Sequence, residues 1–197
     1  MNKYIQDTIR NNSRALLAGL TKPQQKTVSE VVRGLFTAGK PILRAMAQDG
    51  NKSAKKQGEK YAYHLNNINI TEKVNECAIR KTKQEMKKHT IIAYDLTDIS
   101  KESAKKMENL RRVFDGSKRQ VSNGYELHGV GVNNVMVRLE VHDDNQYTRN
   151  QVRRSIVESI SGELNKKGIW VFDRGNDDRQ FFRYFYVMMQ NFISSLD

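Results

Sequence analysis

Two aspartates follow closely similar apolar runs, and they are the residues in this chain best suited to chemistry. Asp95 closes the run IIAYD and Asp173 closes the run IWVFD. Continuous apolar runs of this kind are typical of central strands that are buried on both faces. We expect the two strands to be neighbours, each ending in its aspartate. Both carboxylates would then converge at the carboxyl edge of one sheet, where open α/β sheets place their sites.

A pair of converging carboxylates suits a hard divalent cation. Mg²⁺, or Mn²⁺ in its place, takes oxygen ligands at about 2.0–2.1 Å and keeps several waters. Two such ions about 3.5–4 Å apart are a common device of phosphodiester chemistry. Asp95 and Asp173 are therefore the predicted metal ligands. The alternative is structural, with Asp95 starting a turn and Asp173 capping the next helix or pairing with Arg174.

The elements that position these aspartates begin near residue 90, where helical spacing gives way to strand-like runs. Asn133 and Asn134 favour a hairpin turn. Alternate residues from Val135 to Val141 are expected to share a buried face. The predicted elements are strands over 91–94, 125–132 and 135–142, a helix over 147–166, a strand over 169–172, a helix over 177–190 and a last strand from Phe192. This order predicts a mixed α/β layer arrangement.

Helical spacing characterises the chain before residue 90. Apolar residues recur at helical spacing over 28–36, Gly39 breaks the pattern, and residues 42–46 resume it. Helix, tight turn and short helix are the outline of a helix-turn-helix, although any two packed helices share it. Residues 49–60 are a polar linker or the start of a lysine-rich helix, and residues 71–89 are predicted to form another basic helix.

The net charge of +12 is concentrated in the helical part. The first 90 residues carry 18 Lys and Arg against 7 Asp and Glu, so they hold +11 of the +12. This asymmetry favours a polyanion-binding region, with nucleic acid as the polyanion; the alternative is a solvated lysine-rich surface. No apolar run approaches the ~20 residues of a membrane span, and no secretory signal is visible. With Cys77 as the single cysteine, we expect a cytoplasmic, nucleoid-associated protein without a membrane partner.

Four stretches carry a resemblance to a known family: AYDLTDIS, KKMENLRRVFDGS, NGYELHGVGV and KKGIWVFDRGNDDRQFF. Together with the order of the strands, they resemble insertion-sequence transposases of the DDE type, which act on bacterial mobile elements. The resemblance covers most of residues 88–195. It implies an α/β fold with an RNase H-like mixed sheet and flanking helices over 88–197. It also implies a basic helical DNA-binding region over 1–87 that grips the terminal inverted repeats of the element.

The same resemblance implies a reaction. Asp95 and Asp173 would be the first two members of an acidic triad, acting with Mg²⁺ or Mn²⁺. In the intact enzyme, an activated water cleaves a phosphodiester at the element end, and the freed 3′-OH attacks target DNA. The family's third carboxylate is a Glu on a helix well after the last strand, and no residue here matches it. The chain therefore resembles the front part of a transposase, and we expect two-metal catalysis to be lost in it alone.

Two other functions stay open at this point. One is a non-catalytic DNA-binding protein that occupies transposon ends or inhibits full-length transposase. The other is an RNase H-like nuclease whose third acid is Asp178 or Glu140. A homodimer is left open as the assembly. Asp98 is expected to cap a helix that begins near Ser100, or to reach the metal through water.

Basic residues near these motifs are candidate contacts to DNA. Arg174 follows the second aspartate, where it can clamp a phosphate bidentately or pair with Asp177 or Asp178. The other candidates are Lys55 and Lys56 in the basic region and Arg111, Arg112, Lys118 and Arg119 around the loop after the first aspartate. A solvated charge run is the alternative for this group. The four histidines, His64, His89, His128 and His142, show no metal-ligand spacing.

Overall fold

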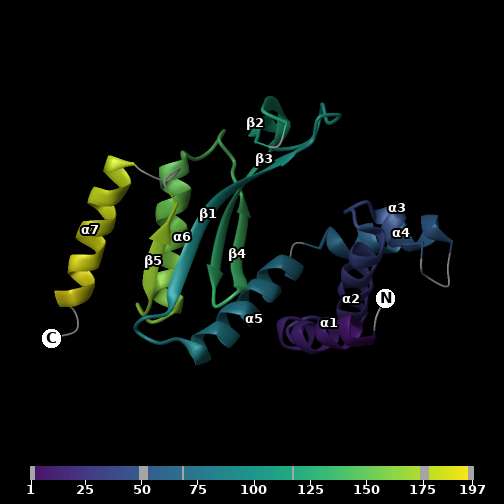
Figure 1. Cartoon of the computed structure of the whole chain (residues 1–197), viewed down its shortest axis with the longest axis horizontal. Coiled ribbons are helices and arrows are strands. Elements are labelled where there is room, and N and C mark those ends of the chain that lie inside the picture. Colours follow the sequence, from purple (N-terminus) through teal and green to yellow (C-terminus); the bar gives the residue numbers. More distant parts are fainter. Residues whose placement is uncertain (1–2, 49–52, 68, 117, 174–177, 195–197) are drawn as a thin grey trace. The chain divides into compact units, whose positions relative to one another are not determined.

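The computed structural model describes residues 3–48, 53–67, 69–116, 118–173 and 178–194. The chain divides into two compact units, Met1–Lys81 and Thr82–Asp197. The first unit is helical, and the second combines a mixed sheet with helices (Figure 1). The predicted boundary after residue 87 lies a few residues further along the chain. Two residues singled out in the sequence, Arg174 and Asp177, lie outside the described residues.

The helices of the first unit begin and end at residues that the sequence marks clearly. They are α1 (Lys3–Leu16), α2 (Lys22–Ala38), α3 (Leu43–Met46), α4 (Ala54–Leu65) and α5 (Asn69–Glu85). Thr21 and Gln24 form a capping box at the start of α2, and Gly39 ends it with a left-handed φ of 64°. The predicted helix, turn and short helix are confirmed as elements. Helix α3 has only four residues, and the longer helix α4 follows it in the chain.

A small apolar core and one close helix contact hold the helical unit together. Buried Leu17, Leu20 and Ile70 form the core, with two partly buried valines packed against it. A Cβ added to Gly34 of α2 would lie 2.3 Å from the carbonyl oxygen of Met46, so α2 and α3 pack backbone to backbone. The core therefore joins α2 to the segment before it and to α5. Cys77, predicted to be buried, is 5% exposed.

The second unit is built on a five-stranded sheet. Its elements are β1 (Ile91–Ser100), β2 (Arg111–Asp115), β3 (Gln120–Val132), β4 (Val135–Val141), α6 (Arg149–Glu163), β5 (Ile169–Phe172) and α7 (Arg179–Ser194). The order is β2-β3-β1-β5, and β4 also pairs with β3. Strand β3 is antiparallel to β1, β2 and β4, whereas β5 is parallel to β1. The predicted mixed α/β arrangement is confirmed at this level.

The hairpin between β3 and β4 has the predicted turn and an unpredicted irregularity. Asn133 and Asn134 adopt left-handed φ values of 48° and 64°, as this turn requires. The ladder then shifts register between Val130 and Gly131. This β-bulge makes Val137 the extra residue of β4 and leaves it fully buried. The prediction that Val135 to Val141 alternate regularly on one buried face is therefore wrong, because Val141 is 46% exposed.

Helices α6 and α7 pack against one side of the sheet, which we call the covered face (Figure 1). The indole Nε1 of Trp170 donates a hydrogen bond to Ser161 Oγ of α6 at 3.1 Å. The ring of Phe172 packs edge-on against Phe181 of α7, with centroids 5.1 Å apart. Tyr94 of β1 lies on the same face and is 2% exposed.

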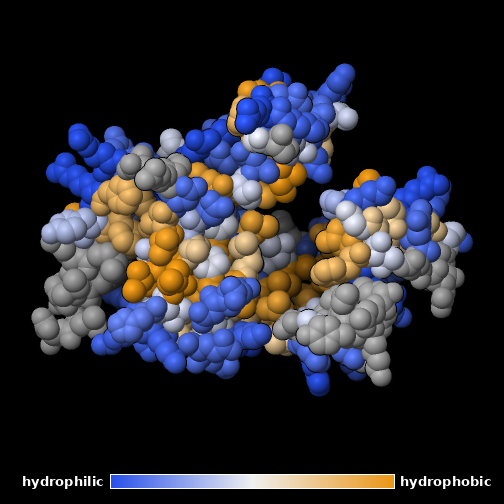
Figure 2. Space-filling view, in the orientation of Figure 1, coloured by the Kyte–Doolittle hydropathy of each residue, from blue (hydrophilic) through white to orange (hydrophobic). Residues whose placement is uncertain are grey.

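The opposite side, which we call the open face, is apolar and exposed in the described part of the chain. Its side chains are Ile91, Ala93 and Asp95 of β1, Met136, Leu139 and Val141 of β4, and Ile169 and Val171 of β5. Ile91 is 56% exposed and Val171 46%. In the view of Figure 2, apolar side chains gather over β1 and β5. The prediction that both strands are buried on both faces is therefore wrong, because their exposure alternates along each strand.

Three further predictions differ from the structure. Phe192 and Ile193, expected to begin a last strand, continue α7. Asp98, expected to cap a helix near Ser100, lies inside β1, which runs on to Ser100. The loop expected after the first aspartate contains β2, which pairs with the first part of β3. In β1 the strand is longer than its apolar run, because pairing with β3 extends it through polar residues.

Candidate functional site

The two aspartates lie next to each other at one end of the β1–β5 ladder. These strands are parallel, and their last paired residues are Tyr94 and Phe172. Asp95 is the next residue of β1 and Asp173 is the first residue after β5, and both are exposed. Since neighbouring strands lie about 4.8 Å apart, the two carboxylates share one small region. Asp173 follows the last residue of β5 as predicted, whereas Asp95 lies in the middle of β1 and not at its end.

The residues of the sheet that neighbour the two aspartates are apolar. Ala93 and Val171 precede the aspartates on the open face, and Gly129 of β3 pairs with Asp95 on the other side. A Cβ added to Gly129 would lie 3.7 Å from the backbone oxygen of Asp95, an ordinary contact distance. Exposed carboxylates in this position are donors that fit a divalent cation of the Mg²⁺ or Mn²⁺ class.

The residues offered as a third acid do not join the pair. Glu140 lies opposite His128 in the β3–β4 ladder, so it belongs to the other side of β4 from Leu139. Asp178 directly precedes α7, and its Oδ1 accepts hydrogen bonds from the backbone N–H groups of Gln180 and Phe181. Its other oxygen accepts from Asn150 at 2.8 Å, and these bonds lower the pKa of Asp178. Asp178 is therefore a helix cap.

A buried polar network lies beneath Asp95, on the covered face. The hydroxyl of Tyr94 is hydrogen-bonded to Nδ1 of His128 at 2.5 Å, and Nε2 of His128 to Nδ1 of His142 at 2.9 Å. His128 is fully buried and His142 is 1% exposed. Burial lowers the pKa of His128 to about 4 and also lowers that of His142, so both rings are neutral near pH 7. Burial raises the pKa of Tyr94, which keeps its proton.

Glu126 is the charged member of this cluster. It is 4% exposed and accepts hydrogen bonds from Nε of Arg149 at 2.8 Å and from the Nη2 of the same guanidinium. Arg111 adds an ion pair at 3.3 Å. Burial alone would raise the pKa of Glu126, but the hydrogen bonds and charge of Arg149 outweigh it and lower the pKa. A buried carboxylate with two arginine partners stays ionised.

This cluster also has the donor set of a metal site. Ligand atoms of Glu126, His128 and His142 lie within 4.8 Å of one another, and two His with one Glu is a set that zinc accepts. The spacing of these three residues in the sequence does not predict the group. Each donor already has a partner, however, since Arg149 holds the carboxylate and Tyr94 holds His128. The geometry therefore fits a metal ion, while the contacts favour a hydrogen-bonded network.

Most of the predicted DNA-contacting residues of the sheet unit are engaged within the protein. Arg111 pairs with Glu126 and with Asp144, the latter at 3.4 Å. Lys118 forms an ion pair with Glu102, which raises the pKa of Lys118. Nη2 of Arg112 donates to the backbone oxygen of Val121 at 3.5 Å. Arg119 adopts a left-handed φ of 51° in the turn before β3, and Arg174 lies outside the described residues.

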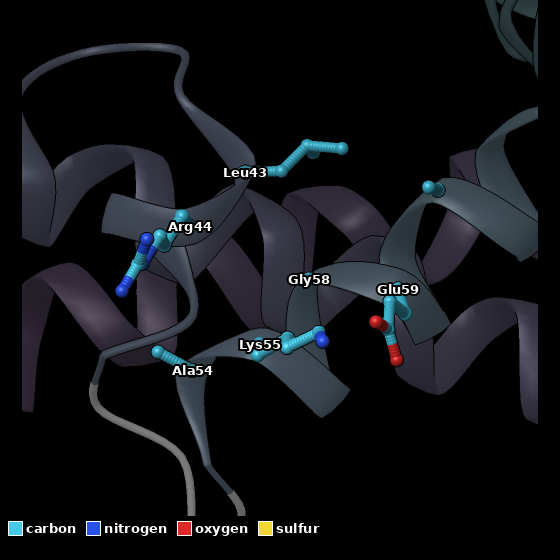
Figure 3. Close-up of a pocket in the computed structure, with 7 residues that line it drawn as sticks. Leu43, Arg44, Ala54, Lys55, Gly58 and Glu59 are labelled. Carbon is cyan, nitrogen blue, oxygen red and sulfur yellow. The ribbon is translucent and has the colours of Figure 1, made fainter.

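Lys55 and Lys56 are both exposed in the first turn of α4. Ser53 caps this helix, its hydroxyl accepting from the backbone N–H of Lys56 at 3.4 Å. Lys55 lines a shallow pocket between α3 and α4, in which Figure 3 shows Arg44 on α3 and Glu59 on α4. Both lysines therefore face solvent, and Lys55 shares the pocket with Arg44.

The buried side of α4 is fixed against α2. Nε2 of Gln57 and Nζ of Lys60 both reach Oε2 of Glu30, each at 2.8 Å. Tyr61 on the same helix is 3% exposed, whereas its neighbour Tyr63 is 77% exposed. The contacts set the rotation of α4 about its axis, so that Lys55, Lys56 and Tyr63 point outward.

Comparison of the chain with protein-family models and with curated protein sequences gives no match. In the described part of the chain, no helix is long and apolar enough to cross a membrane.

Proposed function

We propose that this chain is a DNA transposase of the DDE type. The observation that carries the proposal is the ladder register that sets Asp95 beside Asp173 on adjacent parallel strands. The resemblance of the flanking sequences assigns these two residues to the first two members of an acidic triad. The parallel pairing of β1 with β5 agrees with this assignment.

The topology of the sheet supports an RNase H-like fold. Three antiparallel strands, β1, β3 and β4, are followed by the crossover helix α6, which returns the chain to β5 on the free side of β1. The order β4-β3-β1-β5 places the second acid-bearing strand parallel to the first, as the resemblance implies. Strand β2 is an addition that pairs with the first part of β3.

The helical unit supports DNA binding. It holds most of the positive charge of the chain, and α4 offers Lys55 and Lys56 in its exposed first turn. A capped helix of 12 residues with exposed lysines has the length and charge to enter a major groove. We assign duplex DNA, in the form of the element's terminal inverted repeats, as the partner of this unit.

The residues of the site have distinct roles in this proposal. Asp95 and Asp173 would hold Mg²⁺ or Mn²⁺, which when bound supplies Lewis-acid activation and charge stabilisation for phosphodiester cleavage. Both carboxylates are exposed and so are accessible to an ion from solvent. Arg111 and Lys118 are paired within the protein and serve its structure.

Metal-dependent nicking of supercoiled plasmid by the full chain tests this function. We expect Asp95→Asn and Asp173→Asn each to abolish whatever Mn²⁺-dependent conversion to open circles the wild-type chain retains. Asp98→Asn is the matched control, because Asp98 is an exposed acid three residues along the same strand and on the other face. Equal nicking by all four proteins would contradict the assignment.

A non-catalytic DNA-binding protein is the second candidate. It is favoured by one observation: in the described part of the chain, neither Glu140 nor Asp178 accompanies the aspartate pair. Two carboxylates hold a divalent ion more weakly than three and complete no two-metal site. This candidate predicts DNA binding without nicking, and a DNA affinity that Asp95→Asn leaves unchanged.

A further inference from the structure

The residues that precede the two aspartates pack against each other on the covered face. Tyr94 and Phe172 form the last rung of the β1–β5 ladder, and their ring centroids are 5.5 Å apart. Phe172 also contacts Phe181 and Phe185 of α7, at 5.1 and 5.5 Å. Asp95 and Asp173 come directly after the two residues of this rung. The ring contact is therefore a lateral tie close to both acid-bearing segments.

Tyr94 is held in turn by the buried histidines. Its hydroxyl is hydrogen-bonded to His128 Nδ1, and His128 to His142, at 2.5 and 2.9 Å. A buried hydroxyl without a partner is costly, so this bond defines one position for the ring. Tyr94 and Asp95 are consecutive residues whose side chains point to opposite faces of the sheet. Any shift of Tyr94 along β1 therefore moves Asp95 as well. Apolar packing has no preferred direction, so by itself it would define the position of the Tyr94 ring less sharply than this hydrogen bond does.

We propose that Tyr94 and His128 are positioning residues that fix Asp95 relative to Asp173 from the opposite face of the sheet. This inference rests on the proposed function, since it concerns the metal affinity of the same pair. The bond to His128 ties Tyr94 to β3, and the ring contact ties it to β5. The two acids would then be preorganised for one ion by a residue that touches neither the ion nor DNA.

Mn²⁺ binding to the full chain, followed by electron paramagnetic resonance of the free ion, tests the proposal. Tyr94→Phe keeps the ring against Phe172 but removes the bond to His128. We expect it to weaken Mn²⁺ binding about ten-fold, the lower end of the losses typical when the support of a metal ligand is removed. His128→Leu should have the same effect, whereas His128→Asn keeps an acceptor near the Nδ1 position and should retain most of the affinity.

Two control variants separate positioning from general destabilisation. Val137→Ala removes methyl groups from a fully buried residue of the same face, so it lowers stability without touching Tyr94. Tyr61→Phe removes a buried tyrosine hydroxyl in the helical unit. Both should bind Mn²⁺ as the wild type does at temperatures where all variants are folded.

The outcomes distinguish this inference from the proposed function. If Asp95→Asn abolishes Mn²⁺ binding but Tyr94→Phe and His128→Leu leave it unchanged, the positioning role is wrong and the metal site stands. The positioning role is also wrong if Val137→Ala weakens binding as much as Tyr94→Phe. If the wild-type chain binds no Mn²⁺, both the metal site and the positioning role are wrong.

Discussion

Tyr94 and Phe172 face each other across two parallel strands, and each is followed directly by an aspartate. This single rung explains how residues 78 positions apart in the chain reach one place. Pairing of β1 with β5 aligns Tyr94 with Phe172 along the strands, and their rings are in contact on the covered face, with centroids 5.5 Å apart. Asp95 follows Tyr94 and Asp173 follows Phe172, and both carboxylates are exposed.

DNA binding through α4 predicts a loss of affinity with a defined salt signature. Lys55→Ala/Lys56→Ala removes two exposed cations from the first turn, so binding to a random-sequence duplex should weaken. If both lysines contact phosphates, the slope of log affinity against log salt should fall by about 2, since each contact contributes about 0.9. Fluorescence anisotropy across a salt series measures both quantities.

The matched control for this prediction is another pair of adjacent exposed lysines. Lys105→Ala/Lys106→Ala removes the same charge from the sheet unit. It should leave the salt slope closer to that of the wild type. If the two double variants behave alike, general charge attracts the DNA and α4 has no particular role.

The buried histidines predict that the sheet unit loses stability in mild acid. Burial, aided by the charge of His142, lowers the pKa of His128 to about 4 from an ordinary value near 6.5. Between these values the unfolded chain binds a proton that the folded chain does not. The free energy of unfolding should therefore fall as pH drops from about 7 to 4, by at most about 3 kcal/mol from this residue. The lowered pKa of His142 adds a loss of the same sign.

Urea denaturation followed by the fluorescence of Trp170 measures this loss, because the single tryptophan lies in the sheet unit. His128→Asn removes one titrating group and should flatten the pH dependence. The charged and titratable groups around His128 are Tyr94, Glu126, His142, Arg149 and Arg153. Glu126 acts only below its ordinary pKa of about 4.5, so its contribution belongs to a lower pH window. Identical curves for the wild type and His128→Asn would show that another group is responsible.

Close packing of α2 against α3 makes Gly34 a sensitive position. In Gly34→Ala the new Cβ would meet the backbone oxygen of Met46 at 2.3 Å, so the helices must separate. We expect the free energy of unfolding of the helical unit to fall by about 2–4 kcal/mol, which is at or above the usual cost of overpacking. Gly162→Ala in α6 is the control, because an added Cβ meets nothing within 4 Å there and should stabilise by up to about 1 kcal/mol. Thermal unfolding followed by far-UV circular dichroism distinguishes the two.

Hydrophobic periodicity was sufficient to locate most elements and the two aspartates. The runs ending at Asp95 and Asp173 were recognised because continuous apolar stretches mark strands, and the Asn133–Asn134 turn was recognised from its chemistry. The open face was not foreseen, because apolar side chains on an exposed face and on a buried face look the same in a sequence. Strand β2 was missed because its residues are mostly charged.

The histidine network could not be predicted for a specific geometric reason. A regular hairpin around Asn133 and Asn134 would place His142 opposite Tyr125, on the other side of the sheet from His128. The β-bulge at Val137 shifts the register by one residue, so that the backbone N–H of His142 bonds to the carbonyl of Glu126. A single inserted residue changes the face to which every later side chain of the strand belongs. No feature of the sequence marked that bulge.

Shared binding of one divalent cation by Asp95 and Asp173 can be measured by Mn²⁺ titration of the wild type, the two single Asn variants and the double variant. We expect Asp95→Asn and Asp173→Asn each to abolish the Mn²⁺ site of the wild type. The double variant should then be no weaker than either single one, because both residues belong to the same site. Two single variants that each retain wild-type Mn²⁺ affinity would contradict shared binding.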